Sequence, residues 1–388
     1  MKVAFFSRYP QDPSCPRGGV ESVAVVLARA LADLDDLDVH VITFQRGLLH
    51  ARTEGDGPAT VHRLPGSAWP QILDIIAGPG RKRLLRCVHE LQPDILHTHE
   101  THGLALGRCG IPHVFTMHGF DHANILADRA WLAGIRSRLW RRIERHCLSY
   151  QRHMISITPY VRQTIEPLTG ARIFDIENPV DRRFFDVRRR EEPDRILSVG
   201  WISARKNTLG SVKALKGVLD ARREAILVVA GAVADEDYAR CVRQYTEENG
   251  LSDRIEFVGH VAQEELTCQL ARASVFLLPS RQENSPMAIA EAMATGMPVI
   301  AANRCGMPYM LDEGKSGFLI DPEDTAQITD RLLRLLADQD LRVRMGREAR
   351  RQAIQRFHPI NVARKTRDVY RAVVASCSAM GRPGPVPS

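Results

Sequence analysis

The chain has 388 residues, of which 44% are hydrophobic and 26% charged, and its formal net charge is +7. The length suits two domains, and the composition is typical of a soluble globular protein. The positive charge is compatible with binding to nucleic acid, to an anionic membrane or to a phosphorylated small molecule. No apolar run is long enough to span a bilayer, and the N-terminus lacks the pattern of a signal peptide. Eight scattered cysteines without a C-x-x-C pair favour reduced thiols, so we expect a cytoplasmic protein without a disulfide framework.

Strand-like and helix-like runs alternate along the first half of the chain, which is typical of a parallel α/β sheet. Helices are predicted between the strands, notably at Val20–Ala32 and Arg81–Leu91. The predicted strands of this half are Val3–Ser7, Val39–Thr43, Thr60–Leu64, Ile95–Thr98, His113–Met117, Met154–Ile157 and Arg172–Ile176.

A second α/β run follows a joint that we expect near Asn178–Asp181 and the charged, turn-rich Arg188–Pro193, which should serve as linker. After the last strand the chain looks helical from Thr325 to about Ala375, with a break near Phe357–Pro359, and its Gly/Pro/Ser-rich end should be disordered. The predicted strands are Ile196–Val199, Ile226–Val229, Ile255–Val258, Val275–Leu278, Val299–Ala301 and Gly317–Ile320. We therefore divide the chain into a first domain (1–180), a second domain (181–357), a helix (358–376) that returns to the first domain, and a tail (377–388).

The segment from Val275 to Ala301 predicts a binding site. It reads as a buried strand, a polar loop, a helix with Ser285 as N-cap and Pro286 at the first helical position, and another strand. A helix that starts beyond the carboxyl end of a parallel strand presents N–H groups and partial positive charge to an anion such as phosphate. Glu283 and Glu291 would repel phosphate, but carboxylates bind vicinal hydroxyls, so the segment suits a ligand with both phosphates and sugars.

This segment resembles the donor-binding motif of the retaining glycosyltransferases of family 4, also called group 1. The hallmark of that family is two glutamates separated by seven residues, which Glu283 and Glu291 match. The resemblance implies that Glu283 contacts the donor sugar, that Glu291 holds the ribose hydroxyls, and that the amides of Met287 and Ala288 bind the diphosphate. The chain departs from the family pattern at Asn284 and Pro286, where glycines are usual, and Pro286 supplies no N–H.

A loop with two cations follows the first predicted strand of the second domain. Arg205 and Lys206 come after a strand that ends in Gly200, and cations there would stabilise a diphosphate leaving group. The resembled family has an Arg directly after the glycine and a Lys five residues further on. Lys206 matches that Lys, whereas the Arg position is Trp201, so we expect Arg205 to supply the second cation.

Three further positions fit the resemblance in the first half. Gly18 and Gly19 lie between strand one and a helix, where glycines allow close approach of a ligand, and they match a family loop that faces the donor phosphates. His118 follows a predicted strand and corresponds to a histidine near the donor sugar in the family. His99 and Glu100 end the neighbouring strand and are candidates for the acceptor side. Other histidines cluster nearby, but no ligand set is apparent, so we expect neither a metal nor another cofactor.

The resemblance implies the GT-B architecture, with two facing Rossmann-like domains and a cleft between them. The activity it implies is retaining transfer of a hexose-type sugar from a nucleotide sugar to a glycan or lipid-linked acceptor, as in polysaccharide or glycolipid biosynthesis. A non-catalytic nucleotide-sugar-binding protein, with Trp201 and Pro286 as marks of decay, is one alternative, and a nucleotide-sugar epimerase of similar fold is another. Nucleic acid is not expected as a partner, because the chain has no recognition motif for it and its acidic residues are spread throughout.

The stretch from Asp128 to Arg152 holds seven arginines against two acidic residues. Helical spacing predicts one apolar face, formed by Leu132, Ile135, Leu139 and Ile143, with arginines at the other positions. Such a helix could pack its apolar face on the first sheet and leave the arginines solvated. It could also lie on an anionic membrane, which would place the protein at the inner face of the membrane.

Overall fold

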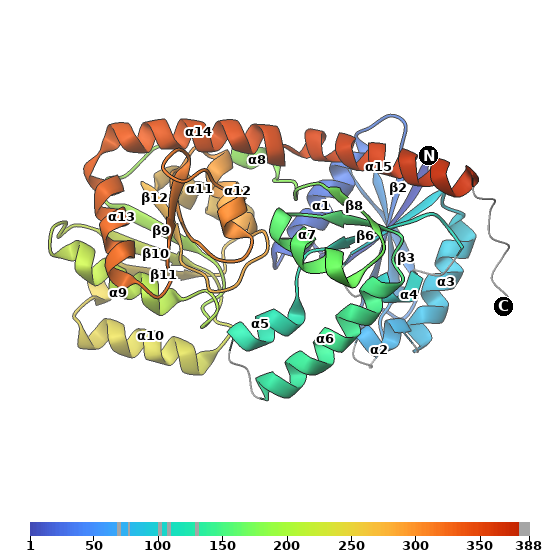
Figure 1. Cartoon of the computed structure of the whole chain (residues 1–388), viewed down its shortest axis with the longest axis horizontal. Coiled ribbons are helices and arrows are strands. Elements are labelled where there is room, and N and C mark those ends of the chain that lie inside the picture. Colours follow the sequence, from blue (N-terminus) through green and yellow to red (C-terminus); the bar gives the residue numbers. More distant parts are fainter. Residues whose placement is uncertain (68–70, 77, 100–102, 107–109, 129–131, 380–388) are drawn as a thin grey trace. The chain divides into compact units, whose positions relative to one another are not determined.

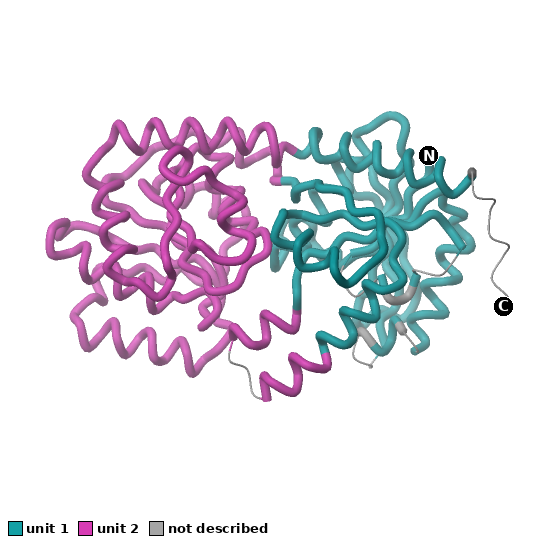
Figure 2. The backbone as a smooth tube through the Cα atoms, in the orientation of Figure 1, with its two compact units in different colours: residues 1–120, 140–179, 359–388 teal, residues 121–139, 180–358 magenta. Residues whose placement is uncertain are grey.

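The structure is a computed structural model that describes residues 1–67, 71–76, 78–99, 103–106, 110–128 and 132–379. The chain divides into two compact units (Figure 2). Unit 1 comprises residues 1–120, 140–179 and 359–388, and unit 2 comprises residues 121–139 and 180–358. Each unit contains a parallel sheet with helices around it, so the predicted fold class of two Rossmann-like α/β domains is confirmed (Figure 1).

The sheet of unit 1 has the strand order β3-β4-β2-β1-β5-β6-β7-β8, and its neighbouring strands are parallel except for the pair β3–β4. Strand β3 was not predicted, because it is a polar strand that pairs with β4 through a tight turn and lacks an apolar pattern. The strands are β1 (Lys2–Phe6), β2 (Asp38–Gln45), β3 (Arg52–Asp56), β4 (Ala59–Pro65), β5 (Ile95–His99), β6 (His113–Met117), β7 (His153–Ser156) and β8 (Arg172–Asp175).

The helices of unit 1 include α15, which comes from the C-terminal end of the chain. Val362 and Tyr370 of α15 join Leu27 of α1 in one buried apolar cluster on the sheet. The helices are α1 (Gly19–Ala32), α2 (Gln71–Ile76), α3 (Pro79–Leu91), α4 (Gly103–Leu106), α7 (Pro159–Ile165), a 3-10 turn (Glu166–Leu168) and α15 (Pro359–Ala379). Helix α6 (Ala133–Ser149) begins within the residues assigned to unit 2 and continues into unit 1.

The sheet of unit 2 has the order β11-β10-β9-β12-β13-β14 and is parallel throughout its described pairs. The chain order therefore reverses between β9 and β12, and ligands of open α/β sheets bind beyond the carboxyl ends of strands at such a point. The strands are β9 (Arg195–Val199), β10 (Ile226–Ala230), β11 (Ile255–Gly259), β12 (Val275–Leu278), β13 (Val299–Ala302) and β14 (Gly317–Ile320). The helices are α5 (Asp121–Ala127), α8 (Arg182–Phe185), α9 (Thr208–Leu219), α10 (Glu236–Glu248), α11 (Gln263–Arg272), α12 (Met287–Ala294), α13 (Thr325–Ala337) and α14 (Gln339–Phe357), with 3-10 turns at Ser252–Arg254 and Met307–Tyr309.

Two expectations about chain organisation differ from the structure. The charged stretch from Arg188 to Pro193 is not a linker, because its charges are bound within unit 2. Glu191 pairs with Arg342 at 2.6 Å, and Glu192 pairs with Arg272 at 2.6 Å. The division between the units falls at Pro179, within the joint predicted at Asn178–Asp181. The second difference is that residues 121–139 group with unit 2, although they were predicted to belong to the first domain.

The C-terminal end also differs. Helix α15 continues to Ala379, three residues into the predicted tail, and residues 380–388 lie outside the described part of the chain. Among the described residues, no helix is both long and apolar enough to cross a membrane.

Candidate functional site

The loops that follow β9 and β12 meet at the point where the strand order of unit 2 reverses. The backbone N–H of Arg281, after β12, donates to the carbonyl oxygen of Arg205, after β9, at 2.7 Å. The guanidinium group of Arg281 donates to the carbonyl of Ala204 and pairs with Glu323 at 2.7 Å. The two loops therefore hold each other in place before any ligand binds.

A carboxylate with two cations lies where these loops meet. Oε1 of Glu283 is 2.6 Å from Nη1 of Arg205 and 2.6 Å from Nζ of Lys206. Only 12% of the Glu283 side chain is exposed, so its charge is balanced mainly by these two partners. Arg205 and Lys206 both contact Oε1 of Glu283, and neither of these two ion pairs involves Oε2. The structure thus brings together three of the residues that the sequence analysis selected.

The electrostatics of this cluster keep Glu283 ionised. Burial raises the pKa of Glu283, but the attraction of Lys206 and Arg205 and their hydrogen bonds outweigh burial and lower it below its usual value. Burial also lowers the pKa of Lys206, against the attraction of Glu283. The two cations of the cluster lie side by side on one carboxylate oxygen, and paired cations of this kind suit a diphosphate.

Two close backbone approaches, each at a glycine, shape the site. A Cβ atom on Gly231, after β10, would lie 2.0 Å from the carbonyl oxygen of Gly200, so this position admits no side chain. A Cβ atom on Gly306 would lie 1.6 Å from the carbonyl oxygen of Asn284. The N–H of Gly306 donates to the carbonyl oxygen of Glu283 at 2.8 Å, so this glycine fixes the backbone of the glutamate.

Helix α12 starts one residue later than its sequence predicts. Pro286 is the N-cap and Met287 the first helical residue, whereas Ser285 and Pro286 were predicted for these positions. The reason is that Pro286 has an extended ψ of 116°, which is not helical. The first-turn N–H groups of a helix lack carbonyl partners within it, so the amides of Met287 and Ala288 keep the character expected of an anion site.

Glu291 is in the second turn of α12 and is buried, with 8% of the residue exposed. Burial raises its pKa to about 7, and the nearby negative charge of Asp181 adds to the effect. A carboxylate in this state takes up or loses its proton near neutral pH. It therefore differs from Glu283, which is held ionised by its cations.

Asp128 is a neighbour of the cluster that the sequence analysis did not select. Its Oδ2 accepts a hydrogen bond from Nε of Arg205 at 3.3 Å, and its Oδ1 is buried without a hydrogen-bond partner in the described residues. Asp128 is 77 positions away from Arg205 in the chain and lies in no motif, so no sequence signal could have identified it. Trp201, at the position where the family has an arginine, is 41% exposed and is not among the cations' contacts in the described structure.

The glycine pair of unit 1 precedes α1. Gly18 has φ −171°, an extended conformation that any residue adopts, and a Cβ atom there would meet nothing within 4 Å. Gly18 and Gly19 are both exposed. The fold of unit 1 therefore does not itself require a glycine at position 18.

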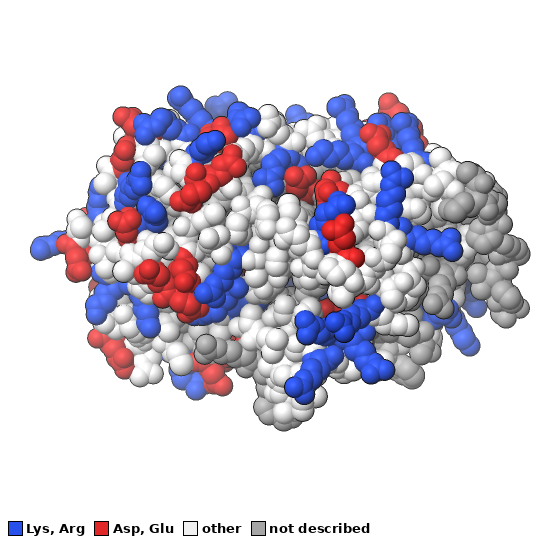
Figure 3. Space-filling model, in the orientation of Figure 1, with Lys and Arg blue, Asp and Glu red and all other residues white. Residues whose placement is uncertain are grey.

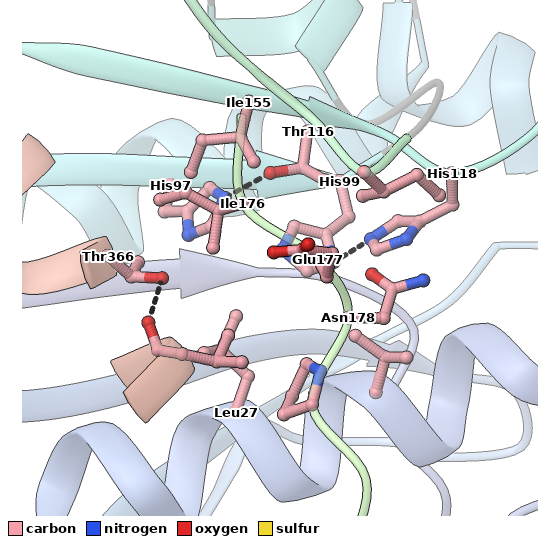
Figure 4. A pocket seen from close by; sticks show the side chains of 14 residues that line it. Leu27, His97, His99, Thr116, His118, Ile155, Ile176, Glu177, Asn178 and Thr366 are labelled. Carbon is pink, nitrogen blue, oxygen red and sulfur yellow. Dashed lines mark hydrogen bonds between the residues drawn. The ribbon is translucent and has the colours of Figure 1, made fainter. Parts of the chain in front are cut away.

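The predicted histidines lie at the carboxyl ends of β5 and β6 and line a small pocket with room for about one water molecule (Figure 4). Nε2 of His118 and Nδ1 of His99 are 2.8 Å apart. Burial lowers the pKa of His118 to about 4, although a hydrogen bond with Asn178 acts in the opposite direction. The His118 ring is therefore placed as a neutral hydrogen-bonding group, and Glu100 lies outside the described residues.

His97 has a structural environment on the same strand as His99. Its Nδ1 bonds the hydroxyl of Tyr370 at 2.6 Å, and its Nε2 bonds Oγ1 of Thr116 at 2.7 Å. Within the described ranges, no group of three or more His, Cys, Asp or Glu side chains is arranged to hold a metal ion.

Comparison with protein families identifies both halves of the chain. The model described as "Glycosyl transferases group 1" matches residues 180–352, and that described as "Glycosyltransferase Family 4" matches residues 17–184. Glycogen synthase of Mycobacterium tuberculosis is 27% identical over 292 residues, which cover 72% of this chain and 69% of that protein.

Two solved structures have a similar fold. Sucrose-phosphate synthase of Thermosynechococcus elongatus matches with a TM-score of 0.82 and 18% identity, covering 97% of this chain and 99% of that one. HepE of Anabaena, in complex with UDP-glucose, matches with a TM-score of 0.71 and 17% identity, covering 96% of this chain and 100% of that one. At these identities the likeness concerns the fold.

Proposed function

Because this chain belongs to the group 1 glycosyltransferases of the GT-B fold, which use nucleotide sugars, we propose that it transfers a hexose with retention of configuration to a glycan or lipid-linked acceptor. The single observation that carries the proposal is the contact of Glu283 with Lys206 and Arg205 at the reversal of strand order in unit 2. It combines a hydroxyl-binding carboxylate with cations that suit a diphosphate.

Each residue of the cluster has a role in this proposal. Lys206 and Arg205 neutralise the diphosphate as its bond to the sugar breaks, with the first amides of α12, those of Met287 and Ala288, bound to the same group. Glu283 accepts hydrogen bonds from the donor sugar through Oε2. Glu291 holds the ribose hydroxyls, for which its ionised form is the better acceptor.

The residues of unit 1 complete the proposal. Gly18 and Gly19 let the backbone approach the donor phosphates, which accounts for a glycine at position 18 that the fold does not need. His118 is held neutral by burial, so it donates or accepts a hydrogen bond at a sugar hydroxyl and carries no charge. His99 orients His118 through their 2.8 Å contact and, with Glu100, is the candidate for the acceptor side.

The bond changes need no protein nucleophile. The acceptor hydroxyl oxygen attacks the anomeric carbon from the face that the diphosphate leaves, and the leaving phosphate oxygen takes the hydroxyl proton. The products are the glycoside and the nucleoside diphosphate. Such a mechanism relies on stabilising the leaving group, which is the role given to Lys206 and Arg205.

Release of nucleoside diphosphate tests the proposal against its rivals. The protein is incubated with UDP-, GDP- and ADP-hexoses, with and without a mixture of simple glycosides and lipid-linked sugars as acceptors. We expect acceptor-dependent release from at least one donor, with the α-linkage retained in the product by NMR. Conversion of the donor sugar without release indicates an epimerase, and donor binding without either reaction indicates a non-catalytic binding protein; both results would overturn the proposal.

A further inference from the structure

The first half of helix α6 exposes two large aliphatic side chains, whereas its last turn buries Cys147 and Leu148. Ile135 is 64% exposed and Leu139 is 59% exposed, whereas Ser137 and Glu144 are each only 6% exposed. Ile135 and Leu139 are therefore not packed on a sheet, although one of the two expectations from the sequence placed them in such a packed face. Single exposed aliphatic side chains are ordinary on a protein surface, but Leu132, Ile135 and Leu139 lie within eight residues of one another, and such a group favours a contact surface.

The exposed side of α6 is also strongly basic. Ile135 and Leu139 are four residues apart and share one face, and Leu132 precedes the helix with 46% of its surface exposed. All five arginines of the helix are exposed, namely Arg136, Arg138, Arg141, Arg142 and Arg145. The one acidic residue of α6 is the buried Glu144, so the exposed side of this helix has no carboxylate. Lys and Arg side chains gather over α6 in Figure 3.

We propose that this surface of α6, formed by Leu132, Ile135, Leu139 and the five arginines, binds the interface of an anionic lipid bilayer. Such an interface accepts aliphatic side chains between its acyl chains and presents phosphates to the surrounding cations. Trp140, which is partly buried on the same helix, adds a residue type that is common at this depth.

The side chains of this surface favour an anionic bilayer over a second copy of the chain and over nucleic acid. A second copy of the chain on a two-fold axis would bring the same patch of each copy together, so five arginines would face five arginines. Nucleic acid would satisfy the arginines but would leave Ile135 and Leu139 facing a polar backbone. An anionic bilayer satisfies both kinds of side chain. The inference concerns where the protein works, and it does not depend on the proposed reaction.

Sedimentation with vesicles tests the proposal. The full chain is mixed with phosphatidylcholine vesicles that contain either no phosphatidylglycerol or about a third of it, at low and high salt. We expect sedimentation with the anionic vesicles only, and release as salt rises, because salt screens exposed charges. Equal recovery with neutral and anionic vesicles, or no binding to either, would overturn the proposal.

Two variants separate the charged and apolar contributions. Replacing Arg138, Arg141, Arg142 and Arg145 together with Gln should weaken partitioning into anionic vesicles more than about tenfold, since each cation near the surface contributes roughly fivefold. The double variant Ile135→Ser and Leu139→Ser should also weaken partitioning while keeping its salt dependence.

The matched control removes the same number of exposed charges elsewhere, by replacing Arg240, Arg243, Arg344 and Arg347 with Gln on α10 and α14. This control should bind vesicles nearly as the parent chain does, and thermal melting confirms that each variant is folded. If the control loses binding as severely as the α6 variant, the interaction is a general effect of charge and the proposal fails. Sedimentation velocity without lipid tests for a dimer. If the parent chain is dimeric and the double serine variant is monomeric, the surface binds a second copy of the chain and the proposal fails.

Discussion

Oε1 of Glu283 lies 2.6 Å from the ammonium nitrogen of Lys206 and at the same distance from the guanidinium of Arg205. The two cations differ in their other neighbours, because Arg205 also binds Asp128 and the carbonyl of Gln282. Part of the charge of Arg205 is therefore compensated by Asp128. Lys206 is the cation more available to a developing negative charge.

This difference predicts that Lys206→Ala lowers kcat/KM more than Arg205→Ala does, with the loss mainly in kcat. A charge-assisted hydrogen bond contributes about 1.5–3 kcal/mol, so we expect a loss of roughly tenfold to a hundredfold for Lys206→Ala. Steady-state kinetics measure it, and Lys213→Ala on the exposed side of α9 is the matched control. If Arg205→Ala proves the more damaging change, the match of this loop to the family pattern around Trp201 is wrong.

The buried Glu291 predicts a pH dependence of donor binding. Its pKa is about 7, and the ionised form is the better acceptor for ribose hydroxyls, so donor affinity should fall as pH drops from 8 to 6. Glu291→Gln should bind the donor at least about tenfold more weakly at pH 8 and should show little of this pH dependence. Calorimetric titration at several pH values measures both. Donor affinity that is unchanged by the substitution would remove Glu291 from the site.

The same residue predicts an effect on stability with a definite sign. The folded-state pKa is raised above the usual 4.5, so the contribution of Glu291 to stability is present below pH 4.5 and is lost as pH rises through about 7. The shift corresponds to about 3 kcal/mol of cost to the folded state above pH 7. The change in Tm caused by Glu291→Gln should therefore be more positive at pH 8 than at pH 5. An equal change in Tm at both pH values would contradict this assignment.

Two glycines predict opposite outcomes for the same substitution. Gly18→Ala should leave Tm unchanged, because a Cβ atom there has open space, yet it should weaken donor binding if phosphates approach that backbone. Gly306→Ala should destabilise unit 2 and disturb Glu283, because its Cβ would collide with the carbonyl of Asn284. Melting and donor titration of both variants provide the comparison. A Gly18→Ala variant with normal donor affinity would exclude the glycine pair from the site.

His118 predicts part of the acid sensitivity of the protein. Its folded-state pKa is about 4 against an unfolded value near 6.5, so its contribution to stability is present above pH 6.5 and is lost as pH falls toward 4. The shift corresponds to about 3 kcal/mol over that range. His118→Gln should therefore show a smaller drop in Tm between pH 7 and pH 4.5 than the parent chain. His50→Gln, at an exposed position, controls for the loss of an imidazole as such, and an unchanged drop in His118→Gln would count against this account.

Much of the fold could be predicted because apolar periodicity marks its strands. The predicted strands such as Val275–Leu278 and His113–Met117 coincide with β12 and β6. The polar strand β3 carries no such signal and forms only through its pairing with β4. The stretch from Arg188 to Pro193 was misassigned because its charges suggest solvent, whereas partners distant in the chain, such as Arg342, bind them.

The candidate site could be predicted where a local motif carries it. Glu283, Glu291 and Lys206 are identifiable from their spacing within two loops and a helix. Asp128 could not be identified, because its relation to Arg205 exists only after folding. The raised pKa of Glu291 likewise follows from burial and from Asp181, neither of which is visible in the motif.

Donor binding by the full chain tests the central claim most directly. Thermal melting is recorded with UDP-, GDP- and ADP-glucose for the parent chain, Lys206→Ala, Glu291→Gln and the exposed control Glu236→Gln. A ligand at about a hundred times its Kd stabilises the folded state by about 2.7 kcal/mol, so at least one donor should raise Tm in the parent and the control, and less in the two site variants. If no donor raises Tm, or if all four proteins respond equally, unit 2 does not hold a nucleotide sugar through these residues.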